Sequence, residues 1–160
     1  CEQIKIKLEV MLGELNELQV NHLLVAQAIG RIGCTHGRKP YVVRVTYAYD
    51  GKDIIGQTRE GKKLTILRKN PNVCFEVDAM NNMVNWRSVI IDGTFSELKE
   101  AEADKAREFL FNHIWPYSTS STIHSHEHEA SHESVNDVNR IKPVMFRITI
   151  KEKSGRFEKQ

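Results

Sequence analysis

The stretch GQTREGKKLTILRKNP, residues 56–71, decides the fold of this chain. Its first residues are typical of a strand, and Gly61 then allows a tight turn because it has no Cβ atom to clash. A short helix follows, with Leu64 and Leu67 able to face inward. The helix ends at Asn70, because a residue that precedes a proline avoids the helical region. The stretch therefore predicts a strand, a turn and a short helix.

The corner between that strand and that helix has the properties of an anion site. Lys62 and Lys63 stand in the first helical turn. Free backbone N–H groups and the helix dipole favour an anion there. A phosphate monoester would fit, with Thr58 as a further ligand. The alternative is that both lysines are solvated charges on a turn beside Glu60, as charge runs often are.

The flanking sequence is typical of a mainly β protein. Residues 41–50, YVVRVTYAYD, alternate, with Val43, Val45, Tyr47 and Tyr49 on one face, and Asp50-Gly51 is a strong hairpin signal. Further strands are predicted at 72–80, at 85–98 with a bulge or bend at Gly93, and at 144–158, which closes the chain. Helices are predicted at 15–28, with Leu15, Leu18, Leu23, Leu24 and Ala28 on one face, and at 99–115, ending at Pro116. About six strands joined mostly as hairpins indicate an antiparallel barrel with peripheral helices.

Length and composition bound the possible functions. The chain has 160 residues, which fits one domain, residues 1–160, with the core best defined over 15–98. The net charge of +2 gives no electrostatic support for a nucleic-acid partner. No apolar run is long enough for a membrane span. Ile4, Ile6 and Leu8 alternate with charges, as in a short strand or an arm. Three cysteines without paired spacing are typical of reduced thiols, so we expect a cytoplasmic protein.

A polar segment, residues 117–140, is rich in Ser and His and is expected to be a loop or insertion. His128 and His132 would share one face of a helix, whereas His124, His126 and His128 would share one face of a strand. The two geometries compete, so no metal site is assigned. Long insertions also serve as lids.

Two of the cysteines are candidates for a reactive thiol. Free cysteine usually behaves as a small buried apolar residue, and Cys34 and Cys74 both fall on predicted strands. A reactive thiol needs exposure and a nearby cation. Cys34 is the better candidate for reactivity, because His36 and Arg38 are close in sequence.

Five segments in fixed order carry a family resemblance: GRIGC, PYVVRVTYAYDG, GQTREGKKLTILRKNP, VCFEVD and WRSVIIDGTFSEL. They resemble the FMN-binding split-barrel superfamily, which includes pyridoxamine 5′-phosphate oxidase. The nearest subgroup is that of the nitroimidazole-resistance and flavin-nucleotide-binding proteins. The resemblance implies a six-stranded antiparallel split β-barrel that binds FMN at the interface of a homodimer.

The same resemblance implies which residues hold the cofactor. Lys63 matches the phosphate lysine and Lys62 the basic residue beside it. The strand residues expected near the flavin are Gln57, Thr58, Val43, Arg44, Val45 and Thr46. Arg44 departs from the family, which usually has an apolar residue or proline there. A last group, expected beside the ring, is Trp86, Arg87 and Ser88.

The implied function is a flavin-dependent oxidoreductase that reduces nitroaromatic or similar small acceptors, or a related oxidase. Its partners would be a second copy of the chain and small-molecule electron donors and acceptors. No side chain stands out as an acid or base, so no catalytic residue is assigned. A non-catalytic flavin-storage protein is the alternative. A haem- or metal-binding relative that uses the His-rich segment is a third hypothesis.

Overall fold

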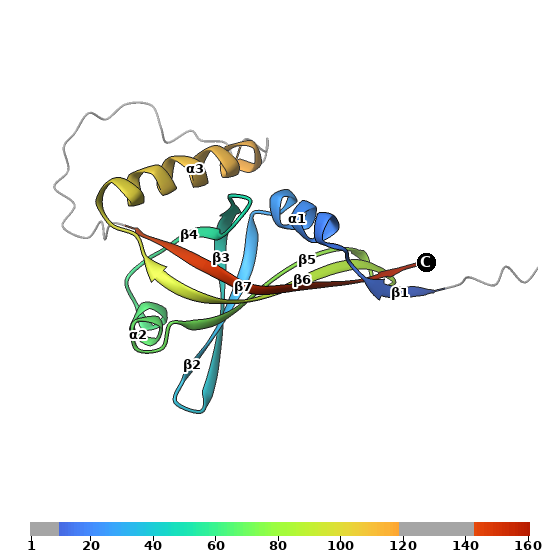
Figure 1. The fold of residues 1–160 in the computed structure, drawn as a ribbon, viewed down its shortest axis with the longest axis horizontal. Coiled ribbons are helices and arrows are strands. Elements are labelled where there is room, and N and C mark those ends of the chain that lie inside the picture. The colour runs from blue at the N-terminus through green and yellow to red at the C-terminus, as the bar shows by residue number, and fades with distance from the viewer. Residues whose placement is uncertain (1–9, 119–142) are drawn as a thin grey trace, which may run out of the picture.

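The computed structural model describes residues 10–118 and 143–160, and Figure 1 shows their arrangement. Seven strands and three helices follow one another along these residues. In chain order they are β1 Met11–Glu14, α1 Glu17–Ala26, β2 Ile29–His36, β3 Lys39–Tyr49, β4 Ile54–Thr58, α2 Lys62–Lys69, β5 Asn72–Asn82, β6 Asn85–Glu97, α3 Glu100–Ser118 and β7 Val144–Lys159.

The strands form one antiparallel sheet that closes on itself. Their order is β1-β7-β4-β3-β2-β5-β6, and β7 also pairs with β6, so β2 to β7 complete a barrel. The predicted six-stranded barrel is therefore confirmed, with β1 as an additional strand along the end of β7. The alternation at residues 4–8 that suggested a strand or arm lies outside the described residues.

The closing strand β7 is the longest, with 16 residues. Residues 144–148 pair with β4, residues 146–158 pair with β6, and residues 156–159 pair with β1. The pairing of β6 with β7 shifts register between Asp92 and Gly93, which confirms the predicted irregularity. A Cβ atom on Gly93 would lie 2.6 Å from the Ile148 side chain, so the close approach requires glycine.

The barrel interior holds the main core. The predicted inward face of β3 is confirmed, since Val45, Tyr47 and Tyr49 are buried, and the Tyr47 ring meets the Phe75 ring at 4.9 Å. The Tyr47 hydroxyl donates to the Leu24 carbonyl at 2.8 Å and ties α1 to the barrel.

The predicted face of the first helix was wrong at one position. Leu18 is 78% exposed, and the buried residues of α1 are Val20, Leu23 and Leu24. The reason is the helical period, because at about 100° per residue Leu18 lies nearly opposite the side of α1 that carries Val20, Leu23 and Leu24. Asn16 caps the N-terminus of the helix through a reciprocal pair of hydrogen bonds with Gln19.

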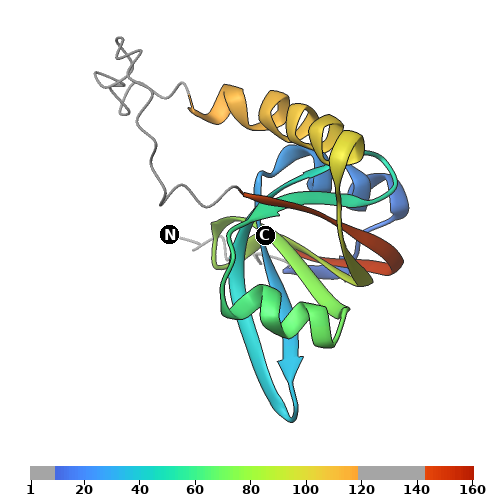
Figure 2. The same cartoon turned by 90° about the vertical axis from the view of Figure 1, so that its left-hand side faces the viewer.

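A second apolar cluster lies outside the barrel, under α3, which crosses one side of the sheet (Figures 1 and 2). Ala103, Ala106 and Leu110 pack there against Ala48, Ile55 and Met145. The prediction that Pro116 ends this helix was wrong. Pro116 lies inside the last turn, and α3 continues to Ser118. None of the helices in the described residues is long and apolar enough to span a membrane.

Candidate functional site

β3 continues well past the end of its neighbour β4. The two strands pair only from Thr46 to Tyr49, and β4 ends at Thr58, where the chain turns toward α2. Within residues 10–118 and 143–160, no strand pairs with residues 39–45 of β3 on this side, although β2 pairs with them on the other. Alternate residues of an antiparallel strand direct N–H and C=O groups to each side. Residues 41–45 therefore form an open edge with backbone donors and acceptors, here called the β3 edge.

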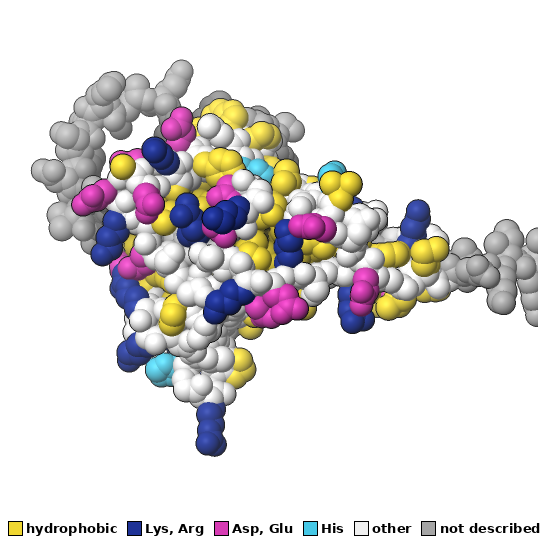
Figure 3. Space-filling model, viewed as in Figure 1, with side chains coloured by type: hydrophobic (Ala, Val, Ile, Leu, Met, Phe, Trp, Pro, Cys, Tyr) yellow, Lys and Arg dark blue, Asp and Glu magenta, His cyan; other side chains and the backbone are white. Residues whose placement is uncertain are grey.

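The N-terminus of α2 lies beside this edge. Its N-cap is Gly61, which offers no side-chain hydrogen bond, and its first turn contains no acidic residue. Lys62 Nζ lies 4.9 Å from the centre of the Tyr41 ring, at the start of the β3 edge. The side chain of Lys63 is half-buried. We call Lys62, Lys63 and the first turn of α2 the α2 corner; Figure 3 shows basic side chains over this part of the molecule.

Burial changes the electrostatics of the corner. It lowers the pKa of Lys63, and the neighbouring Cys34 opposes this effect. Burial raises the pKa of Cys34, and Lys63 opposes that effect. The Cys34 thiol is 4% exposed and donates to the Tyr41 carbonyl at 3.6 Å. The structure therefore argues against a reactive Cys34, because its side chain lacks the exposure that a reactive thiol needs.

The nearest carboxylate to the corner is already neutralised. Glu60 accepts two hydrogen bonds from Arg68, at 3.0 and 2.6 Å. These bonds lower the pKa of Glu60. Arg68 also pairs with Glu97. An anion at the α2 corner would thus meet two lysines whose charges no carboxylate of the described residues neutralises.

The predicted strand residues fall on both faces of the barrel wall, because side chains alternate along a strand. Thr58 is buried at the end of β4, and its hydroxyl donates to the Arg59 carbonyl at 3.4 Å. Of the other strand residues, two are on the inner face and three on the outer: Val43 and Val45 inside, Arg44, Thr46 and Gln57 outside. The β3 edge runs between the two sets.

Trp86, Arg87 and Ser88 do not approach the α2 corner within one chain. Trp86 pairs with Met80, whereas α2 connects to the other end of β5 at Asn72. The eight-residue separation along β5 corresponds to about 27 Å. The Trp86 indole donates to Glu158 at 3.0 Å, and the Ser88 hydroxyl donates to Glu76 at 3.4 Å. The predicted site is therefore divided between two ends of the barrel.

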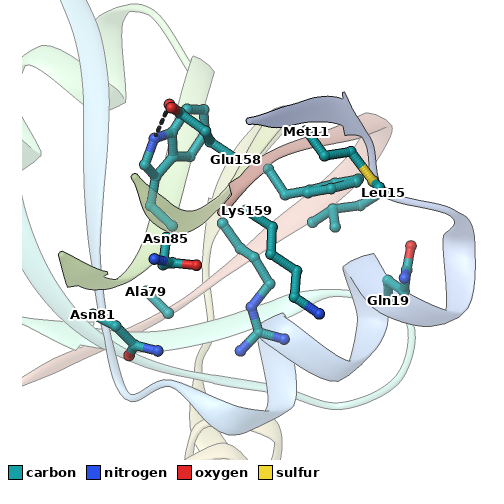
Figure 4. A pocket seen from close by; sticks show the side chains of 11 residues that line it. Met11, Leu15, Gln19, Ala79, Asn81, Asn85, Glu158 and Lys159 are labelled. Atoms are coloured by element: carbon teal, nitrogen blue, oxygen red, sulfur yellow. Dashed lines mark hydrogen bonds between the residues drawn. The ribbon is translucent and has the colours of Figure 1, made fainter. Parts of the chain in front are cut away.

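The sequence reasoning missed two features. The first is Tyr41 beneath Lys62, which inward alternation in β3 could have indicated. The second is a cavity of about 430 Å³ at the far end of the barrel, which Arg87 helps to line (Figure 4). The described residues contain no group of three or more potential metal ligands from His, Cys, Asp and Glu. The predicted polar segment 117–140 lies outside them from residue 119 onward, and the loop prediction was wrong for Tyr117 and Ser118, which belong to α3.

Comparison with known proteins identifies the family to which this fold belongs. The pyridoxamine 5′-phosphate oxidase family matches residues 16–157. The chain belongs to this family. The match confirms the resemblance drawn from the sequence segments.

Two solved structures share this fold. An FAD-binding protein of Mesorhizobium loti is 26% identical with a TM-score of 0.74, covering 95% of this chain and 100% of that one. A 5-nitroimidazole antibiotic resistance protein of Bacteroides thetaiotaomicron shares the fold, at 15% identity and a TM-score of 0.67, over 94% of this chain and 89% of that one. An uncharacterized protein of Rhizobium meliloti is 29% identical over 76 residues, 48% of this chain and 50% of its own length. The chain thus spans about half of that curated relative.

Proposed function

We propose that this family member binds a flavin through its mononucleotide part at the α2 corner and the β3 edge. The observation that carries the proposal is the unpaired β3 edge directly beside an uncapped, dicationic helix N-terminus. Family membership and the similarity to an FAD-binding protein support a flavin as the ligand. FMN is the specific cofactor proposed, since one small cationic cluster suits one phosphate monoester.

The residues of the corner fit a phosphate. Lys62 and Lys63 supply positive charge, and the first N–H groups of α2 supply directed donors. The pairing of Glu60 with Arg68 removes the nearest competing carboxylate. Thr58 lies at the same corner, and rotation of its hydroxyl away from the Arg59 carbonyl would make it a further donor.

The β3 edge would hold the polar side of the ring system. Its backbone N–H groups would stabilise the negative charge that the ring carries when reduced, because they are fixed donors that need no reorganisation. The flavin, when bound, supplies electron-transfer chemistry that no side chain of the chain provides. The role of this protein is thus to orient the ring and tune its electronics.

A second copy of the chain would complete the site. Trp86 and Ser88 face outward at the far end of β6, so one chain cannot bring them to a ring held at its own α2 corner. In a homodimer, the partner could supply them. We also propose that the dimer is an oxidoreductase, which takes electrons from a nicotinamide nucleotide and reduces nitroaromatic or similar small acceptors.

The test is a charge reversal at one end of α2, with a control at the other. The Lys62→Glu/Lys63→Glu variant should lose the flavin absorption spectrum on purification and fail to rebind added FMN. Lys69→Glu makes the same change of charge per residue in the last turn of the helix and should keep the flavin. Equal flavin content in all proteins would refute the proposed site. Turnover with NADPH and a nitroaromatic acceptor tests the enzyme; bound flavin without turnover would favour storage.

A further inference from the structure

The cavity at the far end of the barrel has a floor made by four neighbouring strands. Ala79 of β5, Arg87 of β6, Phe157 of β7 and Gly13 of β1 lie side by side in one row. The Phe157 ring packs directly on Gly13, where a Cβ atom would be 2.7 Å from the ring. Because Gly13 has no Cβ atom, the Phe157 ring can lie close against the backbone of β1 and leave the space above it open.

The next row and α1 complete the cavity. Lys159 pairs with Met11 and is the diagonal neighbour of Arg87, since Arg87 pairs with Phe157 two residues earlier. Leu15 and Gln19 form the side toward α1. Figure 4 shows Lys159 reaching into the space between Gln19 and Asn81. The cavity thus has a floor that combines the apolar Phe157 and Ala79 side chains with Arg87, and further polar groups around its mouth.

The charges of this cavity are not balanced. Within the described part of the chain, neither Arg87 nor Lys159 makes an ion pair or side-chain hydrogen bond. The cavity contains one carboxylate, that of Glu158, which accepts from the Trp86 indole at 3.0 Å. Neither cation pairs with that carboxylate, so Arg87 and Lys159 repel one another, and an anion between them would reduce the repulsion.

We propose that this cavity is a second binding site, separate from the flavin site, for a small organic carboxylate with an apolar body. The carboxylate would lie between Arg87 and Lys159, with the Asn81 amide as a further donor. The apolar body would lie against Phe157 and Leu15. A volume of about 430 Å³ is at the lower end of ligand pockets, which suits a small monocarboxylate.

The experiment uses 3-phenylpropionate as the probe and its neutral amide as the chemical control, by calorimetric titration of the full chain. The acid should bind, and the amide should bind about tenfold more weakly, because it lacks the charge that both cations recognise. Arg87→Gln/Lys159→Gln should reduce acid affinity to that of the amide. Lys151→Gln, an exposed cation elsewhere on β7, should leave it unchanged.

Competition separates this site from the flavin site. Saturating FMN should leave probe affinity unchanged, and Lys62→Glu/Lys63→Glu should bind the probe normally even if it has lost flavin. Displacement of the probe by FMN would overturn the proposal by making the cavity part of the flavin site. Equal affinity for acid and amide, or no measurable binding of the acid, would also overturn it.

Discussion

Lys62 stands over the face of the Tyr41 ring, with its Nζ atom 4.9 Å from the ring centre. This contact joins the first turn of α2 to the beginning of the β3 edge. The ring therefore fixes a flexible lysine where the phosphate and the ring system of a bound nucleotide would meet. The geometry leads to a series of measurable consequences.

Removal of the Tyr41 ring should weaken flavin binding without abolishing it. A cation–π contact at an exposed site contributes about 0.5–1 kcal/mol, so Tyr41→Leu should raise the Kd for FMN about two- to fivefold. Tyr41→Phe keeps the aromatic face and should bind like the wild type. Quenching of flavin fluorescence on titration measures both variants. A loss in Tyr41→Phe equal to that in Tyr41→Leu would show that the hydroxyl, not the ring face, is responsible.

Flavin affinity should fall at alkaline pH, and the fall should begin at a lower pH than it would with a lysine of ordinary pKa. Burial lowers the pKa of Lys63 from the usual lysine value of 10.5. A bound phosphate favours the protonated amine, so the complex holds more protons than the free protein, and affinity decreases as pH rises through the lowered pKa. Lys63→Arg keeps its charge in this range and should lose less affinity. Fluorescence titrations of the wild type and Lys63→Arg across the alkaline range measure this difference. Identical pH profiles would contradict this role of Lys63.

The lowered pKa of Lys63 should make the flavin-free protein more stable, not less, as pH rises. A lysine whose pKa is lower in the folded state opposes folding while it is charged. This destabilisation is full below the folded pKa and is relieved as pH rises from that pKa toward the unfolded value of 10.5. The contribution of Lys63 to stability should therefore increase with pH in that window, and Lys63→Met should remove the increase. Urea unfolding of flavin-free protein at several pH values measures it.

Gly56 should tolerate no side chain. A Cβ atom there would clash with the Phe146 ring, within the closed core. Gly56→Ala should therefore destabilise the fold by about 1–3 kcal/mol, as overpacking of a core does. At Gly33 the nearest atom to a Cβ would be 3.6 Å away, an ordinary contact, so Gly33→Ala is the matched control. Urea midpoints compare the two, and equal midpoints would contradict the close packing against Phe146.

The proposed dimer should form through the outer face of β2 and β3. Ile29 of β2 and Val42 of β3 are exposed there, at 44% and 64%, on the same outer face of these two paired strands. Val42→Asp should shift the mass measured by light scattering from dimer to monomer and lower flavin content with it, since a desolvated charge disfavours an interface. Leu18→Asp, at an exposed position of α1, should remain dimeric. A wild-type monomer that still binds flavin would refute the shared site.

The barrel itself could be predicted from the chain because its signals are local. Strand alternation at Val45 and Tyr47, the Asp50-Gly51 turn and the Pro71 stop each depend on a few neighbouring residues, and all were confirmed. β1 was missed, because a strand of four residues with one half-buried position has no periodic pattern. Its existence depends on pairing with the end of β7, far away in the chain.

The candidate site was predictable only in part for a related reason. The α2 corner lies within one continuous segment, so Lys62 and Lys63 could be placed at a helix N-terminus from the sequence. Trp86 and Arg87 follow the tight turn between β5 and β6, so the register of this hairpin places them at the end of β5 opposite to α2. The sequence does not specify which surfaces of two copies of the chain would meet. The pairing of Trp86 with Met80 placed them far from the lysines.

The long strand β7 also constrains how the molecule is made. It is the last of the seven strands in the described residues, yet β4, β6 and β1 all hydrogen-bond to it. During synthesis, the edges of β4 and β6 that pair with β7 remain unpaired until β7 has been synthesised. Such nascent edges are where misassembly and aggregation begin, so we expect the yield of native protein to be sensitive to substitutions that slow docking of β7.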